Sequence, residues 1–550
     1  MPSPRRSALT LSLIAAGLIV WLNRGIWFYG DDWAYFTIRY FEFTGGQKLE
    51  ALFSPHNEHW VTLPVAIHLV LQRIFGLRTR LPYVGVLALA HATVVYCTSL
   101  IVFRSVGRKW LAWSAGVGVV FLSSGFENLV WTFQITFVGA FALGLVAFLL
   151  IDSNQPSNFK DALIGGVGVL ALATAGTAVA ILFALVALLL IRGQWRRLPL
   201  TVGPGLTAFA VWYAIYGRDS VQPNPTNTQR LDVPAYVWRG VSASLDGLAH
   251  VPGVATVLII LIGLAFIKSS VPRKNYEVPV ALAVGGVFFF TLNGLSRVQY
   301  GIDQAASSRY LYLGVVFFTP IVAVSIVSFV ESSRRGKYLS IALLLWLGIT
   351  GITNLTKDRN ARATSDKQRL SSILATVQLA DLSSTPNEIY PSPQWDIKLT
   401  LADLVRLNQY GMLPARNIDE TYLLDAMVNH FITVTAVARY TPTSIHKILT
   451  DQNATITSAS DGCIAVATTA SPTRIVVYPT GNEPLVLFSE TQNSISMTAG
   501  SAGSKNVSGA AKQLELVANQ AYEVEHWRKN SAVILDLATP GLLTLCGVSP

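Results

Sequence analysis

The chain has 550 residues, of which 51% are hydrophobic and only 13% are charged, and its formal net charge is +10. This composition is too apolar for a soluble multidomain enzyme and is typical of a protein with many membrane spans. The basic residues lie between apolar runs, so membrane topology and anionic lipid explain them better than nucleic acid does. The three cysteines, Cys97, Cys463 and Cys546, are too few for a disulfide scaffold or a cysteine-rich zinc site.

The first apolar run, at residues 8–22, follows Arg5 and Arg6, and no small-residue cleavage site comes after it. We therefore expect an uncleaved first span. Ten further apolar runs lie at 82–103, 110–125, 134–151, 162–173, 178–192, 199–217, 251–268, 278–293, 311–330 and 338–354. With the N-terminus in the cytoplasm, the predicted inner loops are the ones rich in Lys and Arg. The sequence predicts a polytopic helical protein of the cell (plasma or inner) membrane with about eleven spans.

The segment 61–76 is apolar but short for a full crossing, and counting it as a span would invert every later loop. We predict an interfacial or re-entrant helix on the outer side. The first outer loop then covers residues 23–81, within a transmembrane domain of residues 1–354.

From residue 355 the composition becomes more polar. A partly helical stretch leads into runs such as GCIAVATTA and LVLFSET, whose alternation is typical of β-strands. We predict an extracytoplasmic β-rich (α+β) domain at 355–550, built as a small sandwich. Cys463 and Cys546 fall near its first and last strands, and a disulfide or two free thiols are both open.

Two adjacent carboxylates, Asp31 and Asp32, follow the first span. Aromatic residues surround them: Trp27, Phe28, Tyr29 and Trp33. A carboxylate at the bilayer centre costs about 2.5–3.5 kcal/mol, whereas Trp and Tyr favour the headgroup level. We therefore expect the pair at the membrane–water boundary, where both carboxyl groups are accessible to water and can ionise.

If residues 31–43 are helical, Asp32, Tyr35 and Arg39 share one face and Asp31 lies over Tyr35. The acid pair is then a general base with a neighbour that tunes its pKa, because two adjacent carboxylates disfavour joint ionisation. The alternative is a helix N-terminus that favours acidic side chains.

The stretch SPHNEHW contains His56, Glu58 and His59. Histidines at this spacing could ligate a metal with a nearby acid, or hydrogen-bond sugar hydroxyls or an acceptor. A polar interfacial loop is the plain alternative.

Two more polar sets border predicted spans on the same side. Glu127, Trp131 and Gln134 form a sugar-binding edge or a solvated turn. Arg309 and Tyr310 lie where a late outer loop re-enters the membrane, with Arg297 in the same loop. A guanidinium there suits a phosphate, although Arg and Tyr also serve as interfacial anchors. All of these candidates fall on one membrane face.

This pattern resembles the GT-C superfamily of polytopic glycosyltransferases, which use polyprenyl-phosphate-linked sugars. The resemblance covers roughly residues 8–354 and rests on Asp31-Asp32 soon after the first span, the long first outer loop, the many spans and Arg309 beside a late span. PHNEH and FENLVWTFQ are similar to blocks of bacterial members. In many members the pair is Asp-Glu or Asp-Pro, so either aspartate of this chain could be the base.

The resemblance implies an inverting transfer to a cell-envelope glycan, lipid or protein acceptor on the outer face. Asp31 or Asp32 would take the acceptor proton, while Arg309 and Arg297 meet the charge of the departing polyprenyl phosphate. No nucleotide-binding domain is required. A divalent cation, Mg²⁺ or Mn²⁺, could bind through the acids and histidines. C-terminal domains of related arabinosyl- and mannosyltransferases can bind carbohydrate.

Two other functions remain open. A transporter or flippase of lipid-linked envelope precursors predicts ionisable residues inside the spans and related halves. A non-catalytic glycan-binding assembly protein predicts that Asp31 and Asp32 are dispensable while the 355–550 domain keeps binding.

Overall fold

The computed structural model describes residues 3–549 apart from 152–156, 220–224, 269–270, 330–333, 384, 397, 439–445, 451–453, 459–462, 470–472, 479–483, 502–506, 526–530, 538–539 and 547. The chain divides into two compact units, residues 1–364 and 365–550. The division lies inside one long helix, α19 (Arg334–Gln378), and therefore comes later than the boundary at 354 that composition favours.

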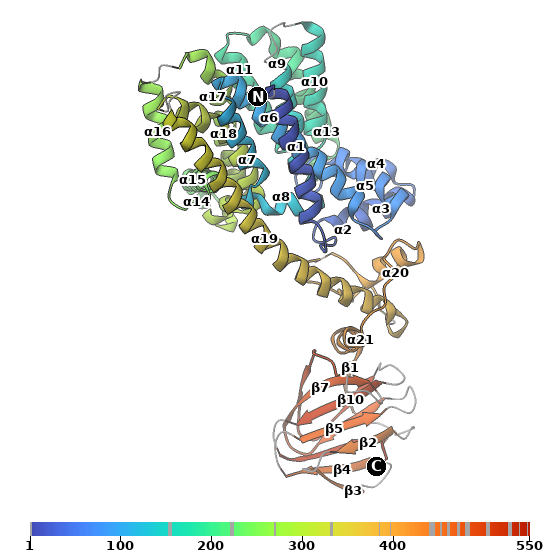
Figure 1. Ribbon diagram of the computed structural model, residues 1–550. Coiled ribbons are helices and arrows are strands. Elements are labelled where there is room, and N and C mark those ends of the chain that lie inside the picture. Colours follow the sequence, from blue (N-terminus) through green and yellow to red (C-terminus); the bar gives the residue numbers. More distant parts are fainter. Residues whose placement is uncertain are drawn as a thin grey trace. The chain divides into compact units, whose positions relative to one another are not determined.

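Unit 1 is entirely helical in its described part (Figure 1). Its longer helices are α1 (Pro4–Leu22), α5 (Thr62–Phe75), α6 (Leu81–Val106), α7 (Lys109–Val120), α9 (Ile135–Ile151), α10 (Asn158–Leu172), α11 (Ala178–Ile191), α13 (Gly203–Ile215), α15 (Val233–Ala249), α16 (Ala255–Lys268), α17 (Glu277–Arg297) and α18 (Ser308–Val327), with α19. The shorter ones are α2 (Asp32–Ala34), α3 (Tyr40–Thr44), α4 (Lys48–Phe53), α8 (Phe126–Val130), α12 (Leu198–Thr201) and α14 (Asn227–Arg230).

Every predicted apolar run overlaps one of these helices, so a polytopic helical unit is confirmed. By length and composition, five helices in the described part of the chain could cross a membrane alone. A sixth forms if the bent pair Trp195–Thr201 and Gly203–Ile215 counts as one span. This is fewer than the eleven full spans expected, because helices such as α7 and α11 have only 12 and 14 residues. At 1.5 Å per residue they reach roughly 20 Å of a core about 30 Å thick.

The segment 61–76 forms α5, whose 14 residues agree with the expectation that it is too short to cross. The region 218–250, which its Pro and Asn residues mark as a loop, contains the 17-residue helix α15. Pro234 lies in the first turn of α15, where a missing N–H costs nothing. The buried face of α15, including Tyr236 and Gly240, packs against α17 and α18.

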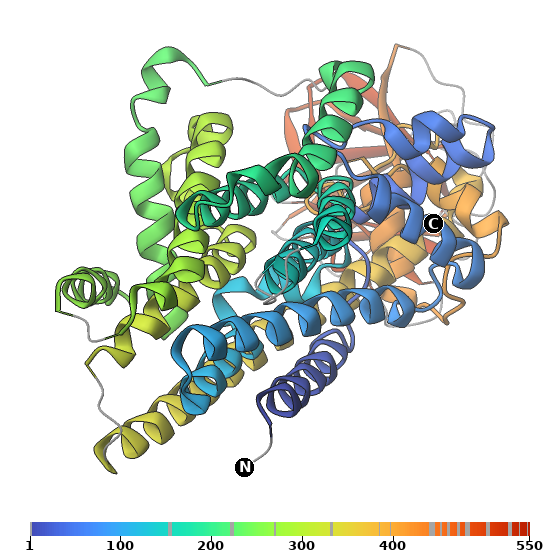
Figure 2. The same cartoon turned by 90° about the horizontal axis from the view of Figure 1, so that it is seen from above.

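The helices of the first loop, α2 to α5, lie together beside the end of α1 (Figure 1). Residues 32–44 are helical, which meets the condition set above for residues 31–43, but the turn Tyr35–Arg39 is a π-helix. A π-turn inserts an extra residue and often marks a functional site. Helix α1 packs along α6, which Figure 2 shows in a view from above.

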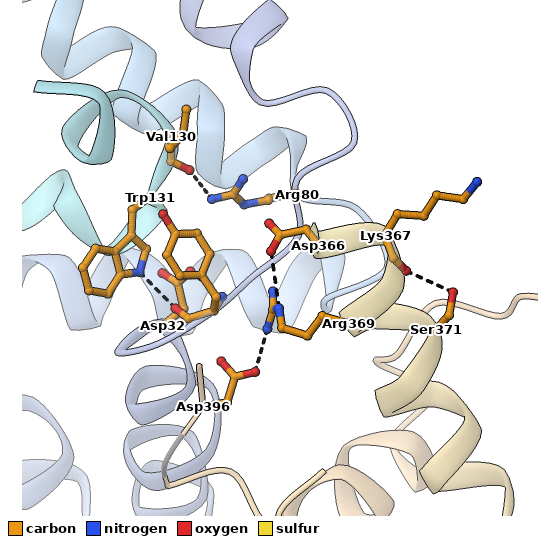
Figure 3. Close-up of polar contacts among 10 residues, drawn as sticks. Asp32, Arg80, Val130, Trp131, Asp366, Lys367, Arg369, Ser371 and Asp396 are labelled. Atoms are coloured by element: carbon orange, nitrogen blue, oxygen red, sulfur yellow. Dashed lines mark hydrogen bonds and ion pairs between the residues drawn. The ribbon is translucent and has the colours of Figure 1, made fainter. Parts of the chain in front are cut away.

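Unit 2 begins with the end of α19, and α20 (Leu401–Gln409) and α21 (Glu420–Ala426) follow. Arg369 donates to Asp396 at 2.6 Å and to Asp366 at 3.4 Å (Figure 3). The first sheet contains β1 (Thr433–Val437), β9 (Gln520–Glu525), β6 (Leu485–Ser489), β11 (Leu542–Cys546), β4 (Cys463–Thr468) and β3 (Ala454–Ser458), in this order. The second contains β12 (Val548–Ser549), β2 (His446–Thr450), β5 (Thr473–Tyr478), β10 (Ser531–Leu537), β7 (Asn493–Ser501) and β8 (Lys512–Leu516).

Alternate side chains of both sheets share one core. Ile475 and Val477 of β5 meet Leu485 and Leu487 of β6 in the same buried cluster. Such alternation is what two sheets packed face to face require. The predicted β-sandwich is therefore confirmed.

Cys463 and Cys546 form a disulfide between β4 and β11, where the two residues lie directly opposite each other. Cys97 is a buried free thiol in α6. Of the two possibilities that the sequence allows, the structure has the disulfide, and it links cysteines 83 residues apart.

We predict that the denatured, unreduced chain exposes one reactive thiol and that reduction raises this to three, the number of cysteines in the sequence. Replacing Cys463 and Cys546 by serine should destabilise the β-domain by about 2–4 kcal/mol, because the cross-link limits the unfolded chain. Thiol titration and thermal unfolding of the full chain check both statements. Three reactive thiols before reduction would contradict them.

Candidate functional site

A polar cleft with a volume of about 330 Å³ gathers most of the predicted site residues in unit 1. It is lined by Asp31, His56, Asn57, His59, Phe133, Gln134, Phe137, Arg297, Tyr300, Gln304, Arg309 and Tyr310. The lining comes from the first loop, the start of α9, the end of α17 and the start of α18. Segments almost 300 residues apart in sequence thus form one concave surface, as expected if they share a membrane face.

Asp31 is the acid that faces the cleft. It precedes α2, its side chain is 40% exposed, and its Oδ1 lies 3.6 Å from Nε2 of His56. This exposure matches the expectation that the Asp31 carboxylate is accessible to water. A carboxylate beside an imidazole can accept a proton from a group bound in the cleft.

Asp32 is fully buried, which corrects the expectation that both acids of the pair are wet. Its Oδ1 accepts a hydrogen bond from the Thr132 hydroxyl at 2.8 Å, and its Oδ2 accepts one from the Tyr29 N–H at 3.2 Å. Burial raises the pKa of Asp32 to about 6, although the Arg80 charge and these hydrogen bonds oppose the rise. Asp32 therefore belongs to the scaffold beneath the cleft.

The buried Arg80, which the sequence analysis did not single out, completes this scaffold. It donates to Oδ1 of Asn23 at 2.8 Å and to the Val130 carbonyl (Figure 3). Asn23 in turn donates to the Leu129 carbonyl at 2.9 Å. The network ties the end of α1 and the start of α6 to α8. The sequence feature that could have indicated Arg80 is its position just before an apolar span. An arginine at that position is equally typical of an interfacial anchor.

His56 and His59 close a tight hairpin. Their backbones exchange two hydrogen bonds of 3.0 Å, and Asn57 takes the left-handed conformation with φ of 52° that the turn requires. Arg39, on the helical face predicted with Asp32 and Tyr35, donates to the carbonyls of Ser54 and Pro55 at 2.9 and 2.7 Å. It thereby fixes the segment that leads into His56.

The Tyr35 ring lies edge-on to His56, with ring centroids 5.7 Å apart. His59 packs edge-on against Phe137, and its ring lies so close to Gly176 that an added Cβ would be 2.7 Å from Nδ1. Burial lowers the pKa of His59, so the neutral imidazole is favoured at neutral pH.

The described residues around the cleft do not form a complete set of protein ligands for a divalent cation. Among the described residues, no three His, Cys, Asp or Glu side chains form a metal-binding group. Asp31 and His56 approach each other, while Nε2 of His59 lies 3.7 Å from Glu58, which is itself paired with Arg297.

Two residues of the predicted sugar-binding edge lie outside the cleft. The Trp131 indole stacks on Tyr29 with centroids 5.2 Å apart, and its Nε1 donates to the Tyr29 carbonyl at 3.0 Å (Figure 3). The backbone N–H of Glu127 donates to the Ser308 hydroxyl at 3.1 Å. Only Gln134 of the three lines the cleft, and its side-chain oxygen accepts a hydrogen bond from Asn128.

The cationic side of the cleft comes from Arg297 and Arg309, with Tyr310 beside Arg309. Arg297 donates to Glu58, and the Arg309 guanidinium lies 5.4 Å from the centroid of the Tyr310 ring. Within the described part of the chain, no carboxylate lies at ion-pairing distance from Arg309. Acid and cation therefore border the same space.

A second cavity of about 500 Å³ is lined by α11, α15, α16, α17 and α18. Of its described lining residues, only Thr291 is polar. Thr291 lies six residues before Arg297 on α17, and Phe318 lies nine residues after Arg309 on α18. At 1.5 Å per residue, the apolar cavity therefore begins roughly 9–14 Å from the two arginines along their helices.

The sequence matches no family model and no curated protein. Two solved structures show a likeness, both of ArnT from Cupriavidus metallidurans. The structure bound to undecaprenyl phosphate has 13% identity and a TM-score of 0.47, and covers 78% of this chain and 92% of its own. The apo structure has 13% identity and a TM-score of 0.48, and covers 77% of this chain and 92% of its own. A likeness of this size identifies neither the family nor the reaction.

The buried Asp32 predicts a pH-dependent stability. Its pKa is higher in the folded protein, about 6, than the ordinary value of 3.8. The contribution of Asp32 to stability should therefore be greatest below pH 4, where this group is protonated in both states, and fall as pH rises to about 6. The loss should be on the order of 3 kcal/mol. Thermal unfolding of the wild type and Asp32→Asn from pH 4 to 7 measures it; parallel curves for the two proteins would contradict the assignment.

Gly30 should not tolerate a side chain. Its φ is 59°, and an added Cβ would lie 2.9 Å from the Trp131 ring. Gly30→Ala should lower stability by about 1–2 kcal/mol, because an L-residue is strained in this conformation. Gly17→Ala in α1, where an added Cβ meets nothing within 4 Å, is the matched control in the same thermal unfolding assay. Equal stability of the two variants would refute the claim.

Proposed function

We propose that this chain is a GT-C-type membrane glycosyltransferase that moves a sugar from a polyprenyl phosphate to a cell-envelope glycan, lipid or protein. The observation that carries the proposal is a single cleft bordered by a solvent-exposed carboxylate, Asp31, and by the guanidinium of Arg309. An apolar cavity lies farther along α18, the helix that carries Arg309. Sugar transfer from a lipid-linked phosphate needs all three features: a base for the acceptor hydroxyl, a cation for the phosphate and an apolar site for the polyprenyl chain.

Asp31 is the proposed base. Asp32 is the weaker candidate, because both of its oxygens already accept hydrogen bonds and no part of its side chain is exposed. The Asp31 carboxylate takes the proton of the acceptor hydroxyl as that oxygen attacks the anomeric carbon. The bond from this carbon to the phosphate oxygen breaks, and the polyprenyl phosphate leaves with the electron pair. One displacement of this kind inverts the anomeric centre.

Arg309 is the proposed phosphate ligand, with Tyr310 beside it. A guanidinium can donate two parallel hydrogen bonds to phosphate oxygens, and its fixed charge stabilises the negative charge that grows on the leaving group. The polyprenyl chain occupies the apolar cavity between α17, α18 and their neighbours. His56, His59 and Gln134 then hydrogen-bond the sugar, with Phe133 and Phe137 against its apolar faces.

We place this cleft and the C-terminal domain on the extracytoplasmic side and the N-terminus in the cytoplasm. The Cys463–Cys546 disulfide supports the extracytoplasmic placement of the C-terminal domain, because disulfides persist in oxidising compartments.

Asp31→Asn should lower sugar transfer from a polyprenyl-phosphate donor by about 10²–10⁴-fold, because an amide cannot take the acceptor proton. Transfer is measured with the purified full chain and a panel of donor sugars. Asp303→Asn is the matched control, because its carboxylate is 90% exposed and lies outside the cleft, and it should retain transfer.

Asp31→Glu keeps the carboxylate but changes its position. Its rate of sugar transfer should lie between those of Asp31→Asn and Asp303→Asn. Normal transfer by Asp31→Asn would remove Asp31 as the base. Absence of transfer by the wild type from every donor would favour a flippase or a glycan-binding protein.

A further inference from the structure

The two arginines of the cleft differ in their surroundings. Arg297 donates to Glu58 and hydrogen-bonds Tyr310. Its side chain is 13% exposed and that of Glu58 is 29% exposed, so the pair is partly shielded from water. Arg309 has no such acidic partner among the described residues, and its guanidinium lies over the Tyr310 ring.

The Glu58–Arg297 pair holds the histidine hairpin. Glu58 lies in the turn between His56 and His59, and Arg297 is the last residue of α17, 239 positions later. Arg39 binds the carbonyls that precede His56. Two guanidinium groups therefore clamp the hairpin: Arg297 through the Glu58 carboxylate, and Arg39 through backbone carbonyls.

The clamp acts on the proposed base through His56. The His56 Nε2 lies 3.6 Å from Asp31, so a shift of the hairpin moves the imidazole relative to the carboxylate. Other ionisable groups around the hairpin are His59, Tyr35, Arg39 and Arg309. Burial works to raise the pKa of Glu58, but His59 and Arg297 outweigh it and hold the pKa below its usual value.

We propose that Arg297 is a positioning residue rather than a phosphate ligand: its ion pair with Glu58 sets the hairpin that orients His56 against Asp31, and Arg309 alone binds the lipid phosphate. This inference rests on the proposed function for the identity of the phosphate. A partly buried ion pair has a distinctive behaviour on mutation. Removing one partner leaves an uncompensated charge, whereas replacing both by neutral groups is much less harmful.

The test compares Glu58→Gln, Arg297→Gln, the double variant and Arg309→Gln as purified full-length proteins. Each single variant of the pair should lose at least about tenfold in kcat, and the double variant should recover to within about threefold of wild type. Inhibition by free polyprenyl phosphate should be unchanged in the double variant and weakened at least about tenfold in Arg309→Gln. The control is Arg239→Gln, which breaks an exposed pair with Asp303 and should alter neither quantity.

The result that overturns the proposal is a double variant no better than Arg297→Gln, together with loss of polyprenyl-phosphate inhibition in both. Arg297 would then be a phosphate ligand. If the wild type transfers no sugar at all, the proposed function fails, but the ion pair is still tested by thermal unfolding of the same four proteins. Additive losses of melting temperature in the double variant would then refute the clamp, and recovery would support it.

Discussion

The burial of one charge next to the cleft shapes the part of unit 1 around the first loop. A carboxylate removed from water must be hydrogen-bonded and compensated, or it stays protonated. Asp32 meets this requirement through Thr132, the Tyr29 backbone and the charge of Arg80. These partners come from separate segments, so satisfying Asp32 fixes how the first loop meets α8 and the start of α6. Because Asp31 is the preceding residue, it is held at the cleft surface.

The cleft divides its charges between two sides. Asp31 and His56 lie on the loop side, and Arg297, Arg309 and Tyr310 lie on the side of α17 and α18. In the proposed reaction, the acid that accepts a proton and the cation that receives the leaving phosphate must not neutralise each other directly. Glu58 pairs with Arg297, and we propose that Arg309 is the cation for the phosphate. In a partly water-excluded space, such fixed charges act more strongly than in bulk solvent.

Local chemistry made much of this site predictable from the sequence. The Asp31-Asp32 pair, the PHNEH stretch and Arg309 each carry groups that are costly near lipid, and Asp31, His56, His59 and Arg309 do line one cleft. The strands of unit 2 were visible through their alternation. The roles inside the Asp pair were not visible, because neighbouring residues can face opposite ways. Arg80 and Glu58–Arg297 depend on partners 50 residues or more away, and α15 was obscured by the Pro and Asn residues that precede it.

The central claim is that the cleft and the apolar cavity together hold a lipid phosphate. A photoreactive polyprenyl phosphate, cross-linked to the full chain and mapped by mass spectrometry, tests it most directly. We predict labels on residues of the apolar cavity such as Phe183, Val284 and Phe318, competed by unlabelled polyprenyl phosphate and reduced in Arg309→Gln. Labels confined to the separate apolar cavity around Leu111, Leu248 and Ile326, or labels indifferent to Arg309, would contradict the account.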